Sequence, residues 1–229
     1  MSAGAVQSMV TALGAEFERE TGNRLNLNFN TVGALRERLQ AGETADLAIL
    51  SASAIEALEK TGLFVPGSRA ELGRTVTGVV VKEGAPLPDI STPEAFKQAL
   101  LKARTVAYSD PAAGGSSGTY FAGLLQKLGI AEAVNSKAVL GKRGYEVAQA
   151  VADGRAEIGT TFISEALTVK GVTVVGPLPG ALHNANSYTA AILNRAAAPE
   201  GARALLRKLT DPASAARWTA AGLEPAFSA

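Results

Sequence analysis

The feature that most constrains this chain is the alternation of short apolar segments with amphipathic segments along almost its whole length. Residues 47–50, 106–109 and 158–162 are apolar or β-branched runs of the kind found in buried strands. Residues 6–17 and 145–152 instead place their apolar side chains at helical spacing. Strands that alternate with helices predict a mostly parallel sheet covered by helices on both faces, so the expected class is α/β.

Composition removes several function classes. Lys and Arg number 22 against 21 Asp and Glu, which leaves no net field to attract nucleic acid or an anionic membrane. The chain has no cysteine and one histidine, His183, so we expect neither a disulfide nor a metal centre, and no cofactor. No apolar run is long enough to span a bilayer, and the N-terminus has no secretory signal, so direct membrane insertion is not expected.

Four glycine-containing turns each lead directly into a predicted helix. They are residues 2–5, 31–33, 114–118 and 143–145. The first amide groups of a helix have no partner within the helix, and the dipole makes this end positive, so each turn is a potential anion site. Any one of these glycines has a simpler explanation, which is that it only makes a turn. Together the four favour a small anionic ligand.

Individual side chains near these turns have competing interpretations. Ser116 and Ser117 are candidate hydroxyl donors to an anion, but a serine at this place also caps a helix. Arg143, next to Lys142, is a candidate cation for a carboxylate or oxyanion, although such pairs are often only solvated. Phe162 is either a wall of the ligand site or a core residue.

A hydrolase is the alternative from the same segment. Gly114, Ser116 and Gly118 match the G-x-S-x-G nucleophile pattern, and Asp153 or Glu165, then His183, follow in hydrolase order. The pattern requires a strand that runs straight into the serine, whereas residues 110–113 intervene here. We therefore rank a serine hydrolase well below a binding protein.

The order of these parts resembles the molybdate-type periplasmic binding proteins of ABC importers. Four segments carry the resemblance, residues 3–17, 34–47, 109–120 and 156–162, and its most specific stretch is residues 39–47. The resemblance implies a periplasmic-binding-protein type II fold with two α/β lobes, 1–78 plus 192–229 and 79–191, and a ligand between them. It also implies a periplasmic location and an ABC permease as partner, and we expect a monomer.

The resemblance places the four turns on the ligand loops of that family. The ligand-binding residues expected in this sequence are Gly4, Ala5, Thr31, Val32, Ser116, Ser117, Gly118, Arg143, Gly144, Tyr145 and Phe162. In molybdate binders the first loop presents a serine near the place of Gly4, and a tyrosine hydroxyl is expected where Phe162 stands. Their second loop is rich in serine, whereas this chain has Thr31, Val32 and Gly33 there. With these donors missing and Arg143 nearby, we expect an organic carboxylate at least as readily as a tetrahedral oxyanion.

One branch of molybdate-binder-like proteins resembles aconitate isomerase, which moves a double bond in an unsaturated tricarboxylate. That chemistry needs a base beside a carboxylate and cations to stabilise the developing charge. Tyr145, Glu146, Lys142 and His183 are the candidates, and their spacing selects none of them.

The first part of the chain carries two further expectations. Residues 25–29 alternate apolar side chains with asparagine, which predicts a strand. The family has an apolar strand before the first ligand loop, whereas only Met1 precedes residues 2–4 here. We therefore expect the sheet of the first lobe either to lose that earlier strand or to rebuild it from another source.

Overall fold

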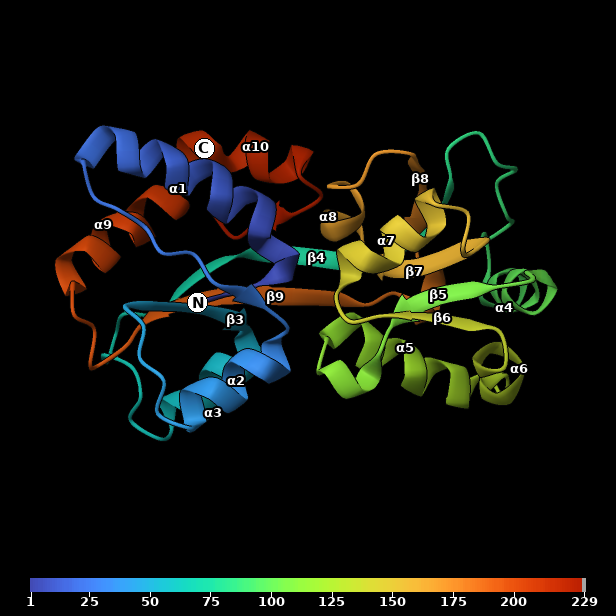
Figure 1. Ribbon diagram of the computed structural model, residues 1–229, viewed down its shortest axis with the longest axis horizontal. Helices are drawn as coiled ribbons and strands as arrows, with labels where there is room; N and C mark the ends of the chain where they lie inside the picture. Colours follow the sequence, from blue (N-terminus) through green and yellow to red (C-terminus); the bar gives the residue numbers. More distant parts are fainter. Residues whose placement is uncertain (228–229) are drawn as a thin grey trace. The chain divides into compact units, whose positions relative to one another are not determined.

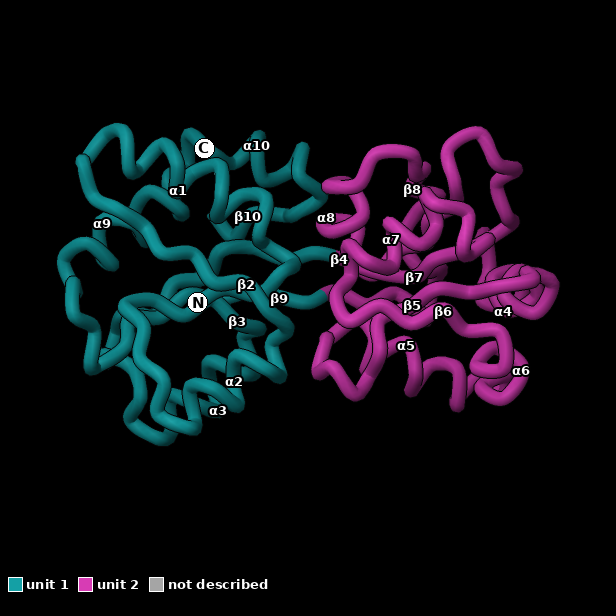
Figure 2. Tube along the Cα trace, in the orientation of Figure 1, with its two compact units in different colours: residues 1–75, 186–229 teal, residues 76–185 magenta. Residues whose placement is uncertain are grey.

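The computed structural model describes residues 1–227 and divides the chain into two compact units. Unit 1 comprises residues 1–75 and 186–229, and unit 2 comprises residues 76–185 (Figure 2). The chain passes from one unit to the other within strand β4 (Ala70–Lys82) and returns at strand β9 (Ala185–Ile192). The sequence predicted these boundaries after residues 78 and 191.

Unit 1 is built on three short parallel strands, β1 (Ser2–Ala3), β2 (Phe29–Asn30) and β3 (Leu47–Ser51). Strand β9 pairs antiparallel with β3, and β10 (Glu224–Pro225) pairs antiparallel with the first part of β4. The helices are α1 (Gln7–Thr21), which follows the 3-10 turn η1 (Gly4–Val6), α2 (Val32–Gln40), α3 (Ala52–Glu59), α9 (Pro199–Leu209), the 3-10 turn η4 (Pro212–Ser214) and α10 (Ala215–Ala220).

These helices cover both faces of the unit 1 sheet. Helices α2 and α3 lie on one face, and α1, α9 and α10 lie on the other (Figure 1). On the first face Leu35, Ile55 and Leu58 are fully buried against the strands. On the second, α1 buries Leu13 and Phe17 and ends at Gly22, whose left-handed φ of 72° stops the helix. Each face therefore excludes water from its own apolar core.

Unit 2 repeats the plan with the parallel strands β5 (Val106–Ser109), β6 (Ala138–Gly141) and β7 (Ile158–Phe162). The second part of β4 pairs antiparallel with both β7 and β8 (Val172–Pro177). The helices are α4 (Pro93–Lys102), the 3-10 turn η2 (Pro111–Ala113), α5 (Ser116–Lys127), α6 (Ala131–Asn135), α7 (Gly144–Ala152), α8 (Ile163–Ala166) and the 3-10 turn η3 (Gly180–Leu182).

Two separate cores cover the faces of the unit 2 sheet. One core joins α4, α5 and α6 through Phe96, Phe121 and Val134. The other joins α7 to the strands through Val147 and Val151. Helix α7 consequently lies on the face opposite to α5, as Figure 1 shows.

The α/β class is confirmed, with differences in detail. The strands that lead between the units, β4 and β9, run antiparallel to their neighbours, so only three strands in each unit are parallel. The strand predicted at residues 25–29 is wrong except at its end. Leu25 packs against α1 at Gly14, and its N–H donates to the Glu18 carboxylate rather than to a strand (2.6 Å).

Of the two alternatives for the start of the chain, the loss of the strand is wrong. Ser2 pairs with Phe29 on one side and with Ile49 on the other, and its N–H donates to the carbonyl of Asn28 (2.8 Å). Two residues are thus enough to continue the sheet between β2 and β3. Within residues 1–227, no helix is both long and apolar enough to cross a bilayer.

Candidate functional site

The candidate residues of unit 2 gather at one edge of its sheet. Strands β5, β6 and β7 are parallel and in register, with Ser109 opposite Gly141 and Tyr108 opposite Thr160. Their carboxyl ends therefore share one edge, and a helix starts after each of them, α5, α7 and α8. In α/β sheets this edge is where ligands bind, because helix N-termini converge there.

The start of α5 carries the two serines, of which Ser116 is half-buried and Ser117 is buried. Gly115 is the N-cap residue, and no side chain caps the helix, so the capping role considered for Ser116 and Ser117 is not observed. Gly118 has a packing role, because a Cβ at this position would lie 2.2 Å from the backbone oxygen of Ser109. This glycine lets α5 approach the end of β5 closely.

The start of α7 holds a fixed cation. Arg143 is the N-cap residue, and its Nη2 donates to the Tyr145 hydroxyl at 2.6 Å while its guanidinium lies 4.7 Å from the centre of that ring. Its Nε also donates to Glu146 at 3.3 Å, and the other oxygen of Glu146 accepts the N–H of Lys142 at 2.8 Å. Glu146 therefore stabilises the turn and forms an ion pair with Arg143 at the helix end.

A buried carboxyl lies directly beneath this turn. Glu165, in the first turn of α8, is 8% exposed, and its Oε1 accepts the N–H of Gly144 at 3.2 Å. Burial raises the pKa of Glu165 to about 7, against the opposing effects of that N–H and of Arg143. From the sequence, Glu165 was considered only as the acid of a hydrolase. Its place shortly after an apolar strand was the available signal.

Gly144 is required by this carboxyl. A Cβ at residue 144 would lie 2.2 Å from Oε2 of Glu165 and 2.4 Å from Oγ1 of Thr161, whereas ordinary contacts exceed 3.4 Å. The sequence offered two reasons for this glycine, a turn or close approach of a ligand. The structure shows a third, which is that Glu165 and Thr161 occupy the space of a side chain.

Phe162 and His183 differ from the rest of the predicted set. Phe162 ends β7 and is 2% exposed, as expected for a core residue rather than an open wall. His183 is exposed in the loop after η3. The hydrolase arrangement is not formed, because β5 ends at Ser109, with η2 before Ser116, and Asp153 lies at the end of α7 opposite to Arg143.

Unit 1 has an equivalent edge after its parallel strands. Gly4 and Ala5 form the turn η1 after β1, and Val32 begins α2 after β2. Thr31 caps α2, because its Oγ1 accepts the N–H of Ala34 at 3.2 Å. Ser51, at the end of β3, caps α3 in the same way and was missed from the sequence, although a serine directly after an apolar strand is a recognisable signal.

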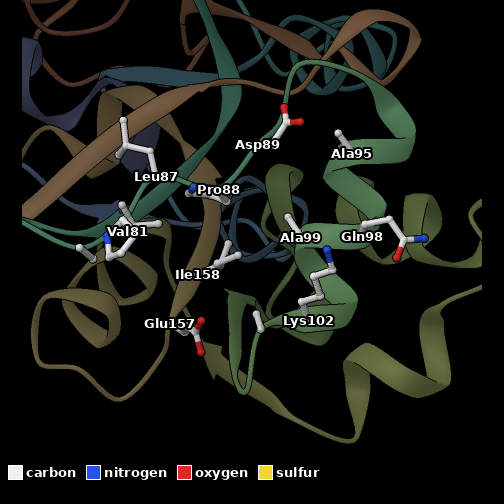
Figure 3. Close-up of a pocket in the computed structure, with 13 residues that line it drawn as sticks. Val81, Leu87, Pro88, Asp89, Ala95, Gln98, Ala99, Lys102, Glu157 and Ile158 are labelled. Carbon is white, nitrogen blue, oxygen red and sulfur yellow. The ribbon is translucent and has the colours of Figure 1, made fainter.

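A cavity of about 390 Å³ in unit 2 lies elsewhere. It is lined by Val81, Leu87, Lys102 and Ile158 among others, from β4, the loop between β4 and α4, α4 itself and the amino end of β7 (Figure 3). None of the predicted ligand residues lines it, so it is separate from the candidate anion site. Among residues 1–227, no group of three acidic or histidine side chains is arranged to hold a metal ion.

Comparison with known proteins gives a consistent result. A family model described as "Bacterial extracellular solute-binding protein" matches residues 1–224. The chain is 32% identical to an aconitate isomerase of Pseudomonas sp. over 98% of its length and 86% of that protein. It is 29% identical to the molybdate-binding protein ModA of Azotobacter vinelandii, over 87% of this chain and 79% of that protein. The solved structure of the periplasmic molybdate-binding protein of that organism superimposes on this chain with a TM-score of 0.73 and 20% sequence identity. The superposition covers 97% of this chain and 96% of that structure.

Proposed function

This chain belongs to the bacterial extracellular solute-binding proteins, and on that premise we propose that it binds a small organic carboxylate through the helix starts at these sheet edges. The observation that carries the proposal is Arg143, which Tyr145 and Glu146 hold at the N-terminus of α7. A planar guanidinium matches a carboxylate in two-point fashion, and the amides of the helix start add donors.

The hydroxyl groups at the site support a carboxylate over molybdate. A tetrahedral oxyanion has four oxygens to satisfy, and Gly4, Val32 and Phe162 carry no hydroxyl. Neither Ser116 nor Ser117 caps α5, and we propose their hydroxyl groups as hydrogen-bond donors to the ligand. Thr31 and Gly118 also remain among the proposed ligand-binding residues. The Thr31 hydroxyl additionally caps α2.

The test is a calorimetric titration with molybdate, tungstate, sulfate, citrate and the two aconitates. We expect a carboxylate to bind most tightly, and Arg143→Ala to weaken that binding tenfold or more, the cost of removing a charge-assisted pair of hydrogen bonds. Arg155→Ala is the matched control, because Arg155 follows the opposite end of α7 and pairs with Asp153. Tight molybdate binding, or equal effects of the two variants, would refute the proposal.

A second function, isomerisation of an unsaturated tricarboxylate, is favoured by the similarity to an aconitate isomerase. The sequence offered Tyr145, Glu146, Lys142 and His183 as bases. To these bases we add Glu165 as a candidate acid, because a carboxyl with a pKa of about 7 is suited to proton transfer near neutral pH. The activity is tested by following the interconversion of cis- and trans-aconitate by NMR. If neither isomer is converted over days at high protein concentration, the isomerase proposal is refuted and only the binding proposal remains.

We also propose a periplasmic location and an ABC permease as partner. Both follow from the family, whose structurally similar member in Azotobacter vinelandii is periplasmic. We further propose that the protein acts as a monomer, which size-exclusion chromatography with light scattering tests. A stable dimer at micromolar concentration would contradict this.

A further inference from the structure

The carboxyl of Glu165 contacts the same helix start that is proposed to bind the ligand. Its carboxyl accepts the N–H of Gly144, the first residue of α7. Anions bind favourably at the N-terminus of a helix, because its free N–H groups and its dipole are positive there. An ionised Glu165 therefore occupies with its own charge the place that an anionic ligand would use.

The surroundings of Glu165 decide whether it can hold a charge. From α7 it faces Arg143, with Lys142 and Glu146 in the same turn, and from β7 it faces Thr161. The strands packed on α8, residues 78–81 and 172–177, contain no charged side chain. The loss of water on burial raises the pKa of Glu165. The N–H of Gly144 and the guanidinium of Arg143 both lower that pKa, but by less, so the net shift is upward.

A protonated Glu165 has a place for its hydrogen. Among the described residues, the buried hydroxyl of Thr161 has no hydrogen-bond partner, and its Oγ1 lies against the same face of Gly144 as Oε2 of Glu165. Within residues 1–227, the hydroxyl of Ser109, which is buried on the neighbouring strand, also has no partner. Buried polar groups rarely remain unpaired, and a hydroxyl can both donate and accept, so Thr161 can serve as a partner of Glu165 in either protonation state, including as the acceptor of a neutral carboxyl.

We propose that Glu165 couples anion binding to the uptake of one proton, so that the site binds its carboxylate ligand with Glu165 neutral. The inference rests on the proposed function, since it requires an anion at the start of α7. The step is a protonation only. Solvent supplies the proton, the carboxylate of Glu165 becomes a carboxylic acid, and the anion of the ligand replaces its charge at the helix end.

The coupling predicts a specific pH dependence. With a pKa of about 7, roughly nine-tenths of Glu165 is protonated at pH 6 and about one-hundredth at pH 9. If only the protonated form binds, affinity falls about a hundredfold across this range, in proportion to that fraction. Proton uptake on binding approaches one per ligand at the alkaline end.

The experiment is a calorimetric titration of the full chain with trans-aconitate at pH 6, 7, 8 and 9. Each pH is measured in two buffers of different ionisation enthalpy, which counts the protons taken up. Glu165→Gln, a neutral isostere, is expected to bind as the wild type does at pH 6 and to lose the pH dependence. Glu157→Gln, at the opposite end of β7, is the control and is expected to keep it.

The possible outcomes separate the inference from the function on which it rests. Binding with the same affinity at all pH values and without proton uptake overturns the coupling and leaves carboxylate binding intact. No binding of trans-aconitate at any pH, together with no binding of cis-aconitate or citrate, overturns both. If Glu165→Gln does not fold, the proton count of the wild type decides the question without it.

Discussion

The substitution Gly144→Ala tests directly whether the fourth glycine turn serves packing or ligand access. The new methyl group would lie 2.2 Å from Oε2 of Glu165 and 2.4 Å from Oγ1 of Thr161. To restore ordinary contact, both atoms must move by about 1 Å inside a buried cluster, where overpacking costs about 1–3 kcal/mol. Weakening the hydrogen bond from Gly144 to the carboxyl adds to this cost.

The gain from placing alanine in a helix is smaller, about 0.5–1 kcal/mol. We therefore expect a net loss of about 1–3 kcal/mol in the free energy of unfolding, measured by urea denaturation followed by circular dichroism. Gly123→Ala is the control, because Gly123 lies in α5 and a Cβ added there would meet nothing within 4 Å, so this change should stabilise the protein slightly.

A double variant identifies the cause of the clash. Removing the carboxyl in Gly144→Ala/Glu165→Ala should cost less than the sum of the two single changes, because the methyl group then has room. If Gly144→Ala is as stable as the wild type and only loses ligand affinity, the packing argument is refuted, and close approach of a ligand is the better explanation for this glycine.

Three further changes test other parts of the structure by the same denaturation assay. Gly118→Ala should destabilise by at least as much as Gly144→Ala, because its Cβ meets the backbone oxygen of Ser109 at 2.2 Å, and backbone yields less than a side chain. Thr31→Ala should cost about 1 kcal/mol through loss of the cap on Ala34, whereas Thr31→Ser should not, and equal losses would exclude capping as the cause. The raised pKa of Glu165 means that the folded state binds this proton more tightly than the unfolded state does. Its contribution is therefore complete below about pH 4.5 and lost as the pH rises through 7, by up to about 3 kcal/mol. Wild type should thus lose stability relative to Glu165→Gln over that range, and parallel pH profiles would contradict the buried carboxyl.

The sequence was sufficient for the class of the fold and for many of its elements. Strand β7 was predicted with its observed bounds, because a buried run of β-branched and small residues is a local pattern. Helices α1 and α7 followed from their apolar spacing in the same way. The strand predicted at residues 25–29 failed because Leu25 and Leu27 alternate as in a strand but pack on α1 as a loop.

What the sequence determined about the site was the set of helix starts and the cation beside one of them. Those features are local, since a glycine turn, a cap and an adjacent Arg143 can be read within a few residues. The environment of Glu165 was decided only by tertiary structure. Its burial and its contact with Gly144, 21 residues earlier in the chain, exist because parallel β6 and β7 flank β5 and bring the starts of α7 and α8 together. The desolvation that raises its pKa depends on that packing, and no spacing along the chain encodes it.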